Sequence, residues 1–148
     1  MSAALLDVNM LIALAWPSHV HHRVAHKWFA ANRSEGWATC PFTQCGFVRV
    51  SSNPRSIREA VEPKEALLLL VRLVTQAHHV FWPDDIALRD DQIPAGLLVS
   101  HSQITDAYLL GLAIHRKGKL VTLDRGVAAL LPANSANQSA LVVLSAKD

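Results

Sequence analysis

The chain has 148 residues, 51% of them apolar and 18% charged, and its 14 lysines and arginines stand against 12 acidic residues. This length fits a single domain over residues 1–148, and the high apolar share excludes an intrinsically disordered chain. Its apolar runs, such as residues 66–71, are far shorter than the ~20 residues of a membrane-spanning helix. Asp7 lies inside the apolar N-terminus, where a signal peptide carries no charge, so we expect a cytoplasmic protein without membrane association.

Strands and helices are predicted to alternate along the chain. Short apolar runs indicate strands, and apolar positions at helical spacing, bounded by proline or glycine, indicate helices. In chain order the predicted elements are a strand at 3–7, helices at 10–16 and 19–32, a strand at 37–40, helices at 41–50 and 62–77, a strand at 79–82, a short helix plus loop within 84–100, a helix at 102–116, a strand at 119–123, a short helix at 127–131 and a strand at 141–144. This alternation predicts an α/β fold, a three-layer sandwich in which helices cover a central, mostly parallel sheet.

Three carboxylates fall where such a fold places ligands. Asp7 and Asp124 each end an apolar run, and Asp106 lies near the start of a long predicted helix. Ligands of open α/β sheets bind beyond the carboxyl ends of the strands. Three close carboxylates repel one another, and Mg²⁺ or Mn²⁺, which prefers such oxygen ligands, relieves the repulsion. The alternative is that these acids are turn formers and helix caps, and that Asn9 is an N-cap.

Five segments carry a resemblance to a known family: LLDVNMLIAL at 5–14, HVHHRVAHKWF at 19–29, CPFTQCGFVRVSSNP at 40–54, ITDAYLLGLA at 104–113 and LVTLDRG at 120–126. In this order they resemble the PIN-domain ribonucleases and, among them, the VapC-type toxins of toxin–antitoxin pairs. The resemblance implies a PIN-like fold and a metal-dependent endoribonuclease that cleaves RNA phosphodiester bonds. It also implies that Asp7, Asp106 and Asp124 hold Mg²⁺, with Mn²⁺ as the alternative.

The resemblance adds residues that orient the acids or the substrate, namely Asn9, Gln44, Thr105 and Arg125. Gln44 departs from the pattern, because many such toxins carry glutamate there. Glutamine brings no charge and cannot act as a base, which leaves tight metal binding and the catalytic rate open. A PIN-like module that binds RNA or a partner, with weak or no catalysis, is therefore the alternative function.

Two protein partners follow from the same resemblance. Toxins of this type bind a small antitoxin whose helix covers an apolar groove. We expect the helices at 10–16 and 42–50 to supply that groove. A homodimer is also implied.

The histidines and cysteines indicate no zinc hydrolase. His19, His22 and His26 share one predicted helix face, but the residue after His22 is an arginine, where zinc proteases carry their glutamate. This face contacts RNA at the rim of the site or has a structural role. Cys40 and Cys45 are too few for a disulfide framework, and we expect two buried thiols.

Overall fold

A five-stranded sheet lies at the centre of the computed structural model, which describes residues 2–146. The strand order is β3-β2-β1-β4-β5, and every neighbouring pair is parallel. The strands are β1 (Ala4–Leu6), β2 (Trp37–Thr39), β3 (His79–Phe81), β4 (Lys119–Thr122) and β5 (Leu141–Val143). The predicted α/β sandwich with a mostly parallel sheet is confirmed.

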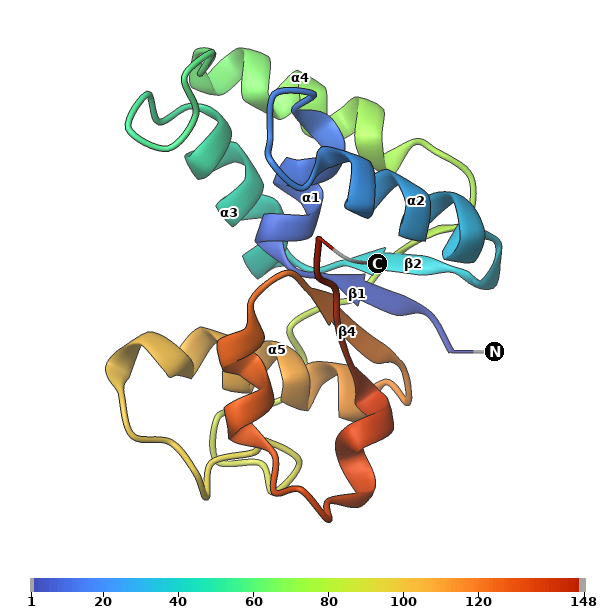
Figure 1. Ribbon diagram of the computed structural model, residues 1–148, viewed down its shortest axis with the longest axis vertical. Helices are drawn as coiled ribbons and strands as arrows, with labels where there is room; N and C mark the ends of the chain where they lie inside the picture. The colour runs from blue at the N-terminus through green and yellow to red at the C-terminus, as the bar shows by residue number, and fades with distance from the viewer. Residues whose placement is uncertain (1, 147–148) are drawn as a thin grey trace.

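Helices cover both faces of this sheet (Figure 1). The α-helices are α1 (Val8–Ala15), α2 (His22–Asn32), α3 (Pro41–Ser51), α4 (Pro63–Val74) and α5 (Ile104–His115). Helices α1 to α4 lie on one side, and α5 lies on the other with the short 3-10 helices η3 (Arg125–Leu130) and η4 (Ala136–Ala140). Two further 3-10 turns are η1 (Arg33–Glu35) and η2 (His101–Gln103).

Alternation along the central strands explains the two cores. In β1, Leu6 packs into the core beneath α1 to α4, whereas Leu5 faces the core beneath α5. Val121 and Leu120 divide in the same way on β4. Successive side chains of a strand point to opposite faces, so a strand buried on both sides reads as an unbroken apolar run.

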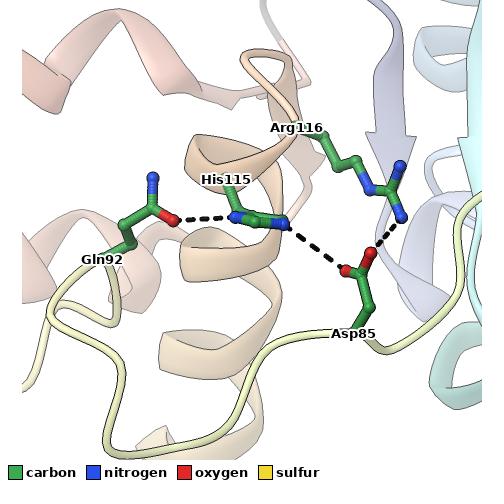
Figure 2. A network of polar contacts seen from close by, with 4 residues as sticks. All are labelled: Asp85, Gln92, His115 and Arg116. Carbon is green, nitrogen blue, oxygen red and sulfur yellow. Dashed lines mark hydrogen bonds and ion pairs between the residues drawn. The ribbon is translucent and has the colours of Figure 1, made fainter.

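The segment between β3 and α5 contradicts the prediction of a short helix within 84–100. Its described residues form turns, and the first helical residues are those of η2. A polar network holds this segment against the end of α5 (Figure 2). Asp85 accepts from Arg116 and lies 3.6 Å from Nε2 of His115, whose Nδ1 is 2.8 Å from Oε1 of Gln92. Contacts to α5, rather than a local periodicity, therefore shape the segment.

Two smaller expectations need correction. Helix α2 begins at His22 and not at residue 19, because residues 17–21 form a turn that leaves Val20 84% exposed. Cys40 is buried as expected, but Cys45 is exposed on α3. Within residues 2–146, no helix combines the length and the apolar character needed to cross a bilayer.

Candidate active site

All three predicted acids line one cavity of about 360 Å³, here called the carboxylate cavity. Asp7 directly follows β1, Asp124 lies two residues after the end of β4, and Asp106 lies in the first turn of α5. The chain runs outward from β1 to β2 and β3 and then returns to the other side of β1 as β4. A crevice forms where the strand order reverses in this way, so the cavity lies at the position that this topology reserves for ligands.

Asp7 is the most buried of the three carboxylates, with 7% of its surface exposed. It is the N-cap of α1: its Oδ1 accepts from the backbone N of Val8 at 2.7 Å. Its Oδ2 accepts from the hydroxyl of Thr122 at 2.7 Å. Burial raises the pKa of Asp7, and the nearby charge of Asp124 raises it further, against the opposing effect of the two hydrogen bonds.

Thr122 lies close to Asp124 in the sequence, and the structure makes it the residue that joins the two strand ends. Its fully buried Oγ1 donates to Asp7, accepts from Nδ2 of Asn9 at 3.1 Å and accepts from the backbone N of Asp124 at 3.0 Å. Asn9 also accepts from the backbone N of Leu123 through its Oδ1, at 3.1 Å. Asn9 therefore orients Asp7 through Thr122. The local sequence signal for this role is the TLD spacing, in which a hydroxyl accepts from the backbone two residues later.

Removing this hydroxyl is expected to be costly. Thr122→Val leaves a buried carboxylate oxygen, an amide and a backbone N–H without their shared partner, so we expect a loss of about 2–3 kcal/mol in the free energy of unfolding. Thr122→Ser keeps the hydroxyl and should lose less than about 1 kcal/mol. Urea unfolding of the two variants measures the difference. A larger loss for Thr122→Ser than for Thr122→Val would mean that the methyl group, not the hydrogen-bonded hydroxyl, is what matters.

Asp106 and Asp124 complete the acidic wall. Burial raises the pKa of Asp106 to about 6, with further contributions from the charges of Asp7 and then Asp124. Asp124 is exposed and is the N-cap of η3, where its Oδ1 accepts from the backbone N of Gly126 at 2.8 Å. The charges of Asp7 and Asp124 thus both act against the ionisation of Asp106.

The donor set fits a hard divalent cation with water among its ligands. Within the described part of the chain, no hydrogen-bond donor reaches the carboxylate of Asp106, although it faces two other acids. In the same residues, no three acidic, histidine or cysteine side chains form a ready-made metal-binding group. Mg²⁺ is commonly held by one or two carboxylates and keeps several waters, which suits this arrangement.

Three of the predicted orienting residues are not among the residues that line this cavity. Among residues 2–146, its lining does not include Gln44, Thr105 or Arg125. Thr105 is the second residue of α5, and Arg125 is an exposed residue of η3. The Nε2 of Gln44 donates at 3.0 Å to Oγ1 of Thr39, the last residue of β2. Thr39 in turn contacts His79 of β3. The Gln44 amide is therefore bonded on the side of the sheet formed by β2 and β3.

The three histidines of the predicted helix face do not share one role. Nδ1 of His22 lies 2.7 Å from the carbonyl of Ala13, and Nε2 of His26 lies 2.9 Å from that of Leu14. A carbonyl only accepts, so both rings donate, and they satisfy carbonyls that the end of α1 leaves without a helical partner. Their role is structural. His19 precedes α2 and lines the carboxylate cavity.

Comparison with known proteins agrees with this architecture. The PIN domain model matches residues 4–130. The chain is 51% identical over 127 residues to Ribonuclease VapC38 of Mycobacterium tuberculosis, a match that covers 86% of this chain and 89% of the relative. It is 45% identical to Ribonuclease VapC39 and 42% identical to Ribonuclease VapC44 of the same organism, over 84% of this chain and 91% and 88% of those proteins. The chain therefore belongs to the PIN-domain family and is a VapC-type member of it.

Proposed function

We propose that this protein is a metal-dependent endoribonuclease that acts in the cytoplasm as the toxin of a toxin–antitoxin pair. One observation carries the proposal: Asp7, Asp106 and Asp124 meet in one cavity at the reversal of the strand order. The similar proteins VapC38, VapC39 and VapC44 are named ribonucleases, which supports RNA as the substrate.

Asp7 and Asp106 are the residues that would hold Mg²⁺ or Mn²⁺ directly, with Asp124 acting directly or through water. When bound, such a cation supplies positive charge against the scissile phosphate and a water of lowered pKa. The protein itself keeps Asp7 in place through Thr122 and Asn9, whose hydrogen bonds leave the carboxylate little freedom to rotate. The apolar side chains of Val50 and Ile57 form another part of the same cavity wall.

Cleavage of single-stranded RNA by the purified protein tests the proposal. We expect cleavage in Mg²⁺, its loss in EDTA, and its recovery when Mg²⁺ or Mn²⁺ is returned in excess. Cleavage that continues in EDTA would exclude metal dependence. Binding of RNA without cleavage under any of these conditions would favour the alternative, a PIN-like binding module.

Gln44 gives a separate prediction. Because its amide contacts Thr39 and does not line the carboxylate cavity, we expect Gln44→Glu to change the rate of RNA cleavage by less than about threefold. The measurement is the single-turnover cleavage rate of both proteins across Mg²⁺ concentrations. An increase of about tenfold or more, with tighter Mg²⁺ dependence, would show instead that the missing charge limits the site.

The antitoxin is proposed to bind the apolar groove between α3 and α4. This groove of about 460 Å³ is lined by Val48, Leu67 and Leu70 among others, and Leu67 is 52% exposed. It differs from the groove predicted from the helices at 10–16 and 42–50, because residues 10–14 of α1 are buried in the core. An amphipathic antitoxin helix is the partner that suits such a groove.

Leu67→Lys tests this surface. We expect it to weaken inhibition by the antitoxin by about tenfold or more, because a charge would be buried at the interface, while RNA cleavage stays unchanged. Inhibition curves with the co-expressed antitoxin provide the measurement, and Lys64→Ala on the same helix is the control. Unchanged inhibition would place the antitoxin elsewhere.

The homodimer stays a prediction, which light scattering of the purified protein measures.

A further inference from the structure

A second cavity, of about 310 Å³, adjoins the carboxylate cavity. The two share the wall formed by His19, Ser56 and Ile57. Arg58 and Glu59 lie among the other lining residues of the second cavity. The carboxylate cavity therefore adjoins a neighbouring space that the proposed chemistry does not use.

His19 has a defined orientation in the shared wall. Its Nδ1 accepts from the backbone N–H of His21 at 3.0 Å, so the hydrogen of the neutral ring is on Nε2. Its backbone N donates to the carbonyl of Trp16, and its carbonyl accepts from the N of His22. Burial lowers the pKa of His19, with smaller effects of the charges on His21 and His22, which favours the neutral ring. His19 is thus a fixed N–H donor between the two cavities.

The remaining walls are held in place by hydrogen bonds. Ser18 Oγ donates to Oε2 of Glu59 at 2.9 Å, which joins the α1–α2 connection to the segment after α3. In that segment, Oδ1 of Asn53 accepts from the backbone N of Arg55 at 3.0 Å, and its carbonyl accepts from the N of Ser56. A cavity whose walls are already ordered binds a ligand without the entropic cost of ordering them.

The groups in these walls suit one nucleotide. Arg58 brings a cation, Glu59 an acceptor, Ser56 a hydroxyl and His19 an N–H donor and a flat ring. A nucleotide needs donors and acceptors for its base edge, a stacking surface, and a cation or N–H for its phosphate. Small-ligand sites start at about 300 Å³, so the volume of the second cavity accommodates a single unit rather than a duplex.

We propose that the second cavity is the subsite for the RNA nucleotide next to the cleaved phosphate, with Nε2 of His19 donating to the RNA backbone at the shared wall. The inference rests on the proposed ribonuclease function. His19 and Arg58 are then substrate-contacting residues that determine which nucleotide is accepted beside the scissile bond.

The test measures RNA binding separately from cleavage. In an Asp7→Asn background, short single-stranded RNAs that differ at one fixed base are titrated by fluorescence anisotropy. We expect His19→Ala to weaken binding about tenfold, and His19→Gln, which keeps an N–H at a similar reach, to restore most of it. Arg58→Ala should weaken binding and reduce the difference between bases. Arg89→Ala, an exposed arginine on the segment beside α5, is the matched control and should change binding less than about twofold.

Wild-type Asp7 versions of the same variants then separate the two proposals, with thermal unfolding confirming that each is folded. If the wild-type protein cleaves RNA while the His19 and Arg58 variants bind and cleave as it does, the subsite is wrong and the ribonuclease function stands. If nothing is cleaved but binding depends on His19, the second cavity still binds a nucleotide of RNA, whereas the ribonuclease function and the placement of that nucleotide beside a cleaved phosphate are wrong. If RNA neither binds nor is cleaved, both are wrong.

Discussion

Asp7→Asn is expected to reduce RNA cleavage at least about 100-fold, since partners one step further from a metal already cost 10–100-fold when removed. Asp7 is the most buried acid of the carboxylate cavity and the one that Thr122 and Asn9 hold in place. The substitution removes its charge and keeps its size. The measurement is the single-turnover rate of cleavage of a labelled single-stranded RNA in Mg²⁺.

Loss of folding is not expected to explain this result. Burial raises the pKa of Asp7, so its charged form is disfavoured in the folded protein. The amide keeps one of the two accepting oxygens, and thermal unfolding checks that the variant is folded. Asp91→Asn, which neutralises an exposed acid in the segment beside α5, is the matched control and should cleave as the wild type does. Cleavage that survives Asp7→Asn would refute the proposed active site.

Asp106→Asn is expected to stabilise the metal-free protein near neutral pH. Burial and the two neighbouring acids raise the pKa of Asp106 from 3.8 to about 6. Because of the raised pKa, the folded protein keeps a proton that the unfolded chain has already released. The contribution of Asp106 to the free energy of unfolding is therefore complete below about pH 4 and is lost as the pH rises through about 6. The rise corresponds to at most about 3 kcal/mol, and to about 1–2 kcal/mol for a half-buried side chain that solvent screens.

Thermal unfolding in EDTA measures this effect. At about pH 7.5 the variant should melt about 3–6 °C above the wild type, and at about pH 5 the gap should shrink. Mg²⁺ should then raise the melting temperature of the wild type more than that of Asp106→Asn, because a ligand stabilises the state that binds it. Asp91→Asn is again the control and should show neither change. A gap of equal size at both pH values, or equal stabilisation by Mg²⁺, would contradict the role of Asp106.

Much of the fold and part of the site follow from local patterns. The runs around Leu5 and Leu120 are apolar without interruption because both faces of these strands are buried, so the order of strands and helices was predictable. Asp7 and Asp124 were recognisable because each ends such a run. The segment at 84–100 was not, because its turns depend on contacts with His115 and Arg116 at the end of α5.

The division between His19 and the other two histidines also required the structure. Regular spacing placed His19, His22 and His26 on one helix face. The chain instead turns before His22, which leaves two rings to satisfy the end of α1 and directs the third to the cavity wall. Periodicity does not reveal where a helix begins when the residues before it are compatible with the same pattern.

By itself, the sequence determined an α/β sandwich, its predominantly parallel strands and three acids at the ends of its elements, since burial and periodicity act over a few neighbouring residues. Only the tertiary structure decided which ends meet. The β1–β4 pairing brings Asp7 against Thr122, 115 residues away, and Asn9 against the same hydroxyl, 113 residues away. The tertiary structure also turned Gln44 toward Thr39 and placed a second cavity beside the carboxylate cavity. Such contacts depend on strand order and loop closure, which no local pattern encodes.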